Sequence, residues 1–210
     1  MLAIDGLAGT GKSTLARMLA KRLVLNYLDT GATFRMTAWA ALKANANLDD
    51  EAEVVRATEG AAISFENGTC IVDGVDVSSK VRSDDVSAAA SKIAVHPQIR
   101  QKLLKWQRSW VDKHGDSVVE GRDTTSVVFP DASLKVFLEA DAGVRAARRS
   151  EAAADSTAAR DQRDTGRATA PLVKVPDALV IDTTRLSLQE VETLVVKAWK
   201  RQKSRQREIG

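Results

Sequence analysis

Residues 6–13 read GLAGTGKS, and this stretch restricts the possible fold more than any other part of the chain. It matches the spacing G-x-x-x-x-G-K-[ST], in which the glycines let the backbone curl so that its N–H groups face phosphate oxygens. The apolar run MLAID precedes the loop, and leucines at helical spacing follow it over residues 12–25. A strand, a glycine-rich loop and a helix in this order predict a phosphate-binding loop in an α/β fold.

The loop predicts a bound nucleoside triphosphate with a magnesium ion. Lys12 is expected to reach the β- and γ-phosphates as a point charge, and the Ser13 hydroxyl is expected to bind Mg²⁺. The N-terminus of the following helix favours the same anion, because its free backbone N–H groups carry partial positive charge. The predicted triphosphate contacts in the loop are Gly6, Leu7, Ala8, Gly9, Thr10, Gly11, Lys12, Ser13 and Thr14.

Such a loop serves two classes of protein, which the loop alone does not separate. A small kinase passes the γ-phosphoryl group to a second substrate, whereas a GTPase-type switch or an ATPase passes it to water. The chain contains no N-K-x-D, which a guanine-specific switch normally carries, and a motor ATPase usually needs a larger body. A kinase also needs a second set of cationic groups to hold its acceptor.

Strand and helix patterns alternate along the rest of the chain. The segments SVVEG, LKVFLEA and DALVID predict parallel strands, and helical patterns cover 31–46, 48–60, 83–95, 97–113, 141–150 and 187–202. Residues 61–78 alternate apolar and polar side chains around the turn pairs NG and DG, which predicts a small antiparallel insertion. The residues expected to face inward from the last helix are Leu188, Val191, Leu194, Val195 and Ala198.

Composition and charge are not typical of a membrane protein or a nucleic-acid-binding protein. The 210 residues carry a net charge of +3, and much of the positive excess lies in KAWKRQKSRQREIG, which is typical of a solvated helix end. No apolar stretch has the length of a membrane span, and MLAIDG lacks a secretory-signal pattern. The single cysteine, Cys70, excludes an intramolecular disulfide. We therefore expect a cytoplasmic monomer that binds neither nucleic acid nor membrane.

Arginines gather where the predicted strands and helices begin or end. Arg35 lies near the start of a helix, and Arg122 with Asp123 follows a strand, where open α/β sheets bind ligands. Arginine is preferred over lysine where phosphate is held by two parallel hydrogen bonds. Residues 160–167, RDQRDTGR, place three more arginines on one helix face with two acids between them. Alone, that segment fits either a salt-bridged helix face or a clamp for an anion.

Five segments of the chain resemble the bacterial cytidylate kinases, a family of P-loop nucleoside monophosphate kinases. They read IDGLAGTGKST, LDTGATFR, VEGRDTTSVVFPDASLKVFLEA, RDQRDTGRATAPL and DALVIDTT, so the resemblance runs nearly from end to end. It implies transfer of the γ-phosphoryl group of ATP to CMP or dCMP, which gives CDP or dCDP and ADP. It also implies three parts: a P-loop core (1–29, 115–148 and 168–210), a monophosphate-binding domain (30–114, with its β insertion at about 61–78) and a short lid (149–167).

The resemblance implies an acceptor site for CMP. The arginines that match those holding the α-phosphate are Arg35, Arg122 and Arg167. The residues that match those recognising the cytosine edge are Ser91, Arg100 and Asp123, which suits the chemistry because an acid accepts from the 4-amino group. The remaining matches near the base, the sugar or the phosphate are Thr30, Phe34, Gly121, Arg160 and Asp164.

The resemblance also implies a donor site in which a lid closes over the phosphates of ATP. The lid residues that match are Arg148, Arg160 and Arg163. No general base is needed, because the phosphate of CMP is already a nucleophile near neutral pH, so the protein supplies alignment and charge. The residues expected to act on the transferred group are Lys12, Arg122, Arg160, Arg163 and Arg167.

Several positions depart from the usual pattern of the family. Phe34 replaces a tyrosine, and Thr125 replaces a glycine, although threonine tolerates fewer backbone angles. The lid segment SEAAADSTAA is short, so we expect it to exclude water less completely. Asp5 has two open interpretations: it lies near Mg²⁺ through water, or it stabilises the turn beside the loop.

Overall fold

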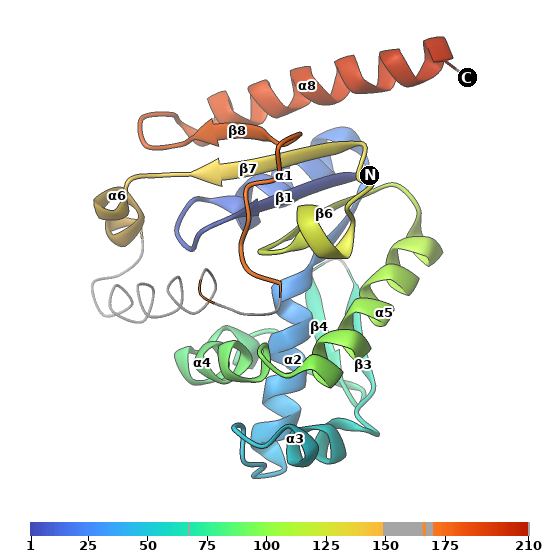
Figure 1. Ribbon diagram of the computed structural model, residues 1–210, viewed down its shortest axis with the longest axis vertical. Helices are drawn as coiled ribbons and strands as arrows, with labels where there is room; N and C mark the ends of the chain where they lie inside the picture. The colour runs from blue at the N-terminus through green and yellow to red at the C-terminus, as the bar shows by residue number, and fades with distance from the viewer. Residues whose placement is uncertain (67, 149–165, 167–169, 210) are drawn as a thin grey trace.

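The computed structural model describes residues 1–66, 68–148, 166 and 170–209, and it confirms the predicted α/β fold (Figure 1). The larger sheet has five strands, all parallel. From one edge to the other they are β2 (Asn26–Asp29), β6 (Ser117–Gly121), β1 (Leu2–Gly6), β7 (Leu134–Glu139) and β8 (Leu179–Asp182). Because the strands are parallel, their carboxyl ends meet at one edge of the sheet, where open α/β folds bind ligands.

Alternate residues of the central strand β1 enter two different hydrophobic clusters. Leu2 and Ile4 join the cluster formed with α1 (Lys12–Leu23) and α8 (Leu188–Ile209), and α8 lies along the top of the sheet in Figure 1. Ala3 joins the cluster that contains residues of α2 (Thr30–Lys43) and α5 (Pro97–His114). A strand whose side chains are buried on both faces is typical of a parallel sheet covered by helices.

A second part of the chain lies below the sheet in Figure 1 and contains the predicted insertion. Its antiparallel sheet consists of β3 (Ile63–Glu66), β4 (Thr69–Val72) and β5 (Val75–Asp76), which confirms the hairpins. Around it lie α3 (Glu51–Thr58), the 3₁₀ helix η1 (Lys80–Arg82) and α4 (Asp84–Ile93). The Trp110 indole N–H on α5 donates to the Phe65 carbonyl at 2.9 Å, which attaches the small sheet to that helix.

Capping residues and a proline mark where several helices begin. Asp50 caps α3 by accepting from the Glu53 N–H at 3.1 Å, and Pro97 is the first residue of α5. Asp141 caps the short helix α6 (Ala142–Ala147) by accepting from the Gly143 N–H at 2.8 Å. After β6, residues Thr124–Val128 form one turn of π-helix, η2, which the sequence did not reveal.

The structure adds one strand and corrects one prediction. The edge strand β2 was not predicted, because no alternating pattern marks NYLD and only one of its four residues is buried. Leu194 was expected to face inward, but its side chain is 45% exposed, so that prediction is wrong. The buried stripe of α8 is rotated away from Leu194 and runs through Val191, Val195, Val196 and Trp199.

The proposed lid lies almost entirely outside the described residues. This applies to four predicted site residues, namely Arg160, Arg163, Asp164 and Arg167. The division into core, monophosphate-binding domain and lid therefore stays a prediction. Among the described helices, none combines the length and the apolar character that crossing a membrane requires.

Candidate active site

The phosphate-binding loop joins β1 to α1 in the predicted conformation. Its glycines Gly6, Gly9 and Gly11 have φ angles of +150°, +78° and +91°, which other residues rarely adopt. A Cβ atom on Gly9 would lie 2.7 Å from the Arg145 carbonyl oxygen, so the loop also passes close to α6. The loop is held by its own side chains, because Thr10 Oγ1 and Lys12 Nζ each donate to the Leu7 carbonyl at 2.8 Å.

A strongly charged cavity of about 360 Å³ lies on one side of this loop. Its walls bring together loop residues, the start of α2 and the end of β6, as the sequence predicts. The cationic side chains that line it are Lys12, Arg35, Arg82 and Arg122, and the acidic ones are Asp29 and Glu120. Of these, the sequence predicted Lys12, Arg35 and Arg122. Asp29 and Glu120 lie in the quoted segments that contain Arg35 and Arg122 but were given no role, and Arg82 comes from a separate segment.

The predicted phosphate-binding arginines are fixed by bonds to the core. Arg35 Nη2 donates to Asp29 Oδ2 at 2.7 Å, and Asp29 also caps α2. Arg122 Nη1 donates to the Gly6 carbonyl at 2.7 Å, which ties the loop after β6 to the phosphate-binding loop. The buried Arg35 Nε has no hydrogen-bond partner among the described residues.

Glu120 is a buried acid at the carboxyl end of β6, directly beside the loop. Its side chain accepts from the Tyr27 hydroxyl at 2.9 Å. Burial raises the pKa of Glu120 above its ordinary value and the Asp29 carboxylate adds to this, whereas Lys12 and hydrogen bonds from Ser13 and Tyr27 lower it. Sequence reasoning missed Glu120, although an acid in the apolar strand SVVEG was a usable signal.

The geometry is compatible with a magnesium ion carried by the phosphates. Ser13, Asp29 and Glu120 line one cavity, and hydroxyl and carboxylate oxygens are ligands that Mg²⁺ accepts. Among the described residues there is no cluster of three or more acids, histidines or cysteines that would form a cage by itself. Mg²⁺ usually takes only one or two protein carboxylates and completes its shell with water and phosphate oxygens.

Two of the residues predicted to read the base, Arg100 and Asp123, contact each other, and Phe34 lies beside them. Arg100 forms a buried ion pair with Asp123, and its guanidinium lies over the Phe34 ring at 5.5 Å. Arg100 Nη1 also donates to the Ala94 carbonyl at 3.0 Å. Ser91 is buried on α4. The structure therefore groups three side chains from α2, α5 and the loop after β6 that are distant in sequence.

Two further predicted residues lie where the start of α2 packs against the end of β6. The Thr30 hydroxyl is buried and donates to the Glu120 carbonyl at 2.8 Å. Gly121 leaves no space for a side chain, because a Cβ atom there would lie 2.2 Å from Thr30 Oγ1. A larger residue at position 121 would push α2 away from the sheet.

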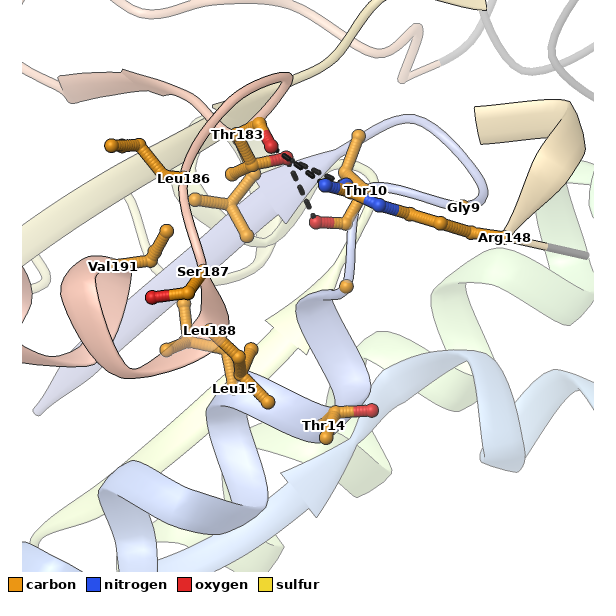
Figure 2. A pocket seen from close by; sticks show the side chains of 12 residues that line it. Gly9, Thr10, Thr14, Leu15, Arg148, Thr183, Leu186, Ser187, Leu188 and Val191 are labelled. Atoms are coloured by element: carbon orange, nitrogen blue, oxygen red, sulfur yellow. Dashed lines mark hydrogen bonds between the residues drawn. The ribbon is translucent and has the colours of Figure 1, made fainter. Parts of the chain in front are cut away.

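A second cavity, of about 460 Å³, lies on the other side of the phosphate-binding loop (Figure 2). Arg148, at the end of α6, reaches across it and donates to Thr183 Oγ1 at 3.0 Å and to the Thr183 carbonyl at 2.6 Å. The apolar part of its wall comes from α1, β7, the start of α8 and the chain that leads into α8, and consists of Leu15, Leu138, Leu186, Leu188 and Val191. The sequence predicted Arg148 here but not Thr183, although Thr183 lies in the quoted segment DALVIDTT.

Comparison with known proteins identifies the family. The sequence model of the cytidylate kinase family matches residues 2–201. The chain belongs to the cytidylate kinase family. It is 40% identical, over 93% of its length, to a cytidylate kinase of Aeromonas hydrophila, 92% of which is covered. It is 39% identical, over 95% of its length, to a bifunctional pantoate ligase/cytidylate kinase of a Synechococcus strain, but it spans only 40% of that protein.

Solved structures agree on the fold. A crystal structure of an uncharacterized protein from Eubacterium ventriosum matches with a TM-score of 0.54, covering 94% of this chain and 96% of that chain, at 12% sequence identity. At this identity the likeness concerns the fold alone.

In this cytidylate kinase family member, Asp5 stabilises the turn after β6. Its fully buried carboxylate accepts from the Thr124 N–H at 3.0 Å, the Thr125 N–H at 2.7 Å and the Thr125 hydroxyl at 2.6 Å. Burial raises the pKa of Asp5, and these hydrogen bonds oppose the rise. The geometry favours the second of the two interpretations of Asp5. Thr125 is also not among the non-glycine residues with positive φ, so it fits this turn without strain.

Proposed function

We propose that this chain transfers the γ-phosphoryl group of ATP to CMP or dCMP, giving ADP and CDP or dCDP. The observation that carries the proposal is that the phosphate-binding loop separates two cavities, and that Gly9, Gly11 and Thr14 line both of them. One cavity has an apolar wall suited to a nucleobase, and the other has an arginine-rich wall suited to a monophosphate. A donor in the first and an acceptor in the second would meet at the loop.

In this proposal ATP binds with its base in the cavity of Figure 2 and its phosphates along the loop. Lys12 exchanges its bond to the Leu7 carbonyl for bonds to the β- and γ-phosphates. Arg148 and Thr183 form the wall beside the phosphates. The lid arginines Arg160 and Arg163 would cover them, as the family resemblance implies.

The acceptor CMP binds in the arginine-rich cavity and towards Phe34. Arg35 and Arg122 hold its phosphate, and Arg167 completes the set as the resemblance implies. Asp123 accepts from the 4-amino group of cytosine while Arg100 donates to its O2/N3 edge. Ser91 lies near the base and Asp164 near the ribose.

The chemical step is an in-line displacement. An oxygen of the CMP phosphate forms a bond to the γ-phosphorus of ATP as the bond from that phosphorus to the bridging oxygen of ADP breaks. Lys12 and the arginines stabilise charge that spreads over the transferred oxygens, and they also hold donor and acceptor in line. Ser13, Asp29 and Glu120 would hold Mg²⁺, which when bound neutralises charge on the phosphates.

The competing function is transfer of the phosphoryl group to water. The arginine-rich cavity of about 360 Å³ favours a kinase, because a hydrolase has no need to hold a second anion. We also propose that the protein acts as a cytoplasmic monomer in pyrimidine nucleotide metabolism, without binding nucleic acid. The composition and the family membership support these points.

An acceptor panel tests the proposed function. ADP release from ATP is measured with CMP, dCMP, UMP, AMP or shikimate as the acceptor, and without any acceptor. We expect CMP and dCMP to give the highest rates. Activity only with AMP or shikimate would reject the cytidine acceptor while leaving a kinase, and equal rates with and without an acceptor would reject the kinase.

A further inference from the structure

Arg82 is a cation at the charged cavity that has been given no role so far. It is the last residue of η1, and the preceding Val81 is 1% exposed and anchors this short helix in the core. The next residue, Ser83, caps α4 by accepting from the Val86 N–H. Arg82 therefore projects from a fixed junction between two helices of the part of the chain that carries the insertion.

The Arg82 side chain lines the same cavity as Lys12, Ser13 and Arg122. Its charge acts close to Arg35, since both guanidinium groups oppose the rise in the pKa of the buried Cys70 thiol. Arg82 therefore adds a positive charge to the wall of the cavity that η1 and α4 form. The other cations of the cavity come from the end of β6, the phosphate-binding loop and α2.

The guanidinium of Arg82 makes no hydrogen bond or ion pair with any residue that the structure describes, although Asp84 and Asp85 follow it directly in sequence. Arg35 and Arg100, by contrast, are each paired with a carboxylate. Pairing with Asp84 or Asp85 would have marked Arg82 as an ordinary surface residue. Instead, among the described residues its charge has no ion-pair partner, and it lies on the wall of the cavity proposed for CMP.

We propose that Arg82 is a further catalytic residue, which contacts the phosphoryl group as it passes from ATP to CMP. The inference rests on the proposed function and adds a residue to it. Charge spreads over the equatorial oxygens of the transferred group, and a guanidinium binds two such oxygens at once. Arg82 makes no covalent bond and moves no proton; the bond made and the bond broken are those of the in-line displacement.

The test compares Arg82→Ala and Arg82→Lys with the control Lys80→Ala. Lys80 lies two residues away on the same helix, but its ammonium group lies over the Trp39 ring at 5.7 Å and does not line the cavity. We expect kcat/KM for CMP to fall roughly 10- to 100-fold in Arg82→Ala, the range for losing hydrogen bonds to a charged group. Arg82→Lys should recover part of the loss because it keeps the charge, and Lys80→Ala should stay within about twofold of wild type.

Two binding measurements separate a catalytic role from a structural one. Arg82→Ala should keep its affinity for ATP within about twofold, but should bind a bisubstrate analogue, in which adenosine and cytidine are joined through a phosphate chain, at least about tenfold more weakly. Tm should not change, because Arg82 is exposed. A parallel loss of ATP affinity and Tm would contradict the inference.

The outcome for the wild type separates this inference from the proposed function. An active wild type with an Arg82→Ala variant within about twofold of it would overturn the inference and leave the kinase function intact. A wild type without activity on CMP or dCMP would overturn both.

Discussion

At the scale of single residues, the site depends on side chains that the protein holds in place through its own carboxylates and carbonyls. Asp29 positions Arg35, Asp123 positions Arg100, and the Gly6 carbonyl positions Arg122. Long arginine side chains lose rotamer freedom in these bonds during folding, so binding a phosphate afterwards costs less entropy. The same bonds set the distances between the acceptor groups and the phosphate-binding loop.

The Asp123–Arg100 pair gives the first residue-scale prediction. Asp123→Ala should lower kcat/KM for CMP at least about tenfold, because the proposed acceptor for the 4-amino group is lost and Arg100 is left without its buried partner. Affinity for ATP, measured by calorimetry, should stay within about twofold. Asp123→Asn, which retains one acceptor oxygen, is the milder matched variant. A collapse of ATP affinity in both would show that Asp123 does not serve the base.

The Asp5–Thr125 contact gives the second residue-scale prediction. Thr125→Val should lower the free energy of unfolding by about 1.5–3 kcal/mol, because it removes a hydrogen bond to a buried carboxylate while keeping the volume. Thr125→Ser keeps the hydroxyl and should lose clearly less stability. Chemical denaturation measures both. Equal losses in the two variants would mean that the methyl group, and not the hydroxyl, stabilises this turn.

Sequence reasoning identified residues that belong to motifs and missed those that proximity alone defines. Lys12, Arg35, Arg122 and their neighbours stand at fixed spacings or match family segments, and the structure brings them to one cavity. Glu120 is hidden in an apolar strand, and Arg82 comes from a short helix of the inserted region. Nothing local in the sequence marks Arg82, because its role depends on which strands and helices become neighbours, whereas the acid in the apolar strand SVVEG was a usable signal for Glu120.

At the scale of elements, strands were predictable where burial on both faces gives an apolar run. β1 and β6 are buried throughout and β7 over three consecutive residues, whereas the edge strand β2 has a single buried residue and was missed. The other edge strand, β8, also has a single buried residue, but its sequence LVID begins with three apolar residues, so it was predicted. The stripe of α8 was misjudged for a related reason, because the inward direction of a helix depends on the element it packs against. Leu194 is as apolar as Val195, and only the position of α1 and the sheet decides which of them is buried.

The short lid segment gives the prediction at this scale. A lid that covers the phosphates less completely admits more water, so ATP hydrolysis without CMP should form a larger share of turnover than in a cytidylate kinase with a longer lid. The comparison measures inorganic phosphate release against CDP formation in both enzymes under identical conditions. A share no larger than that of the long-lid enzyme would show that the short segment closes equally well.

At the scale of the whole molecule, the buried groups at one edge of the sheet affect both nucleotide binding and the free energy of unfolding. The parallel strands deliver Asp5, Glu120 and the loop to the same place, and two of these groups are acids whose pKa is raised by burial. A folded protein that holds an acid with a raised pKa binds its proton more tightly than the unfolded chain does. Ionisation of such an acid near neutral pH therefore lowers stability.

Glu120→Gln tests this relation between site and stability. At pH 7–8 the variant should unfold at a higher temperature than the wild type, because it removes a buried charge. The difference in unfolding temperature should shrink as the pH falls through the raised pKa of Glu120 towards the pKa of an unfolded glutamate. In that range Glu120 of the folded wild type takes up a proton and becomes neutral, as the glutamine already is. Kinase activity should fall at the same time, since a proposed magnesium ligand is lost. A variant less stable than the wild type at pH 7–8 would show that ionised Glu120 is net stabilising.

The most direct measurement follows the γ-phosphoryl group itself. ATP labelled in its γ-phosphate is incubated with the protein, Mg²⁺ and CMP, and the products are separated. Our account predicts that the label appears in CDP, that its transfer requires CMP, and that little of it appears in inorganic phosphate. Label found only in inorganic phosphate, at a rate that CMP does not change, would contradict it.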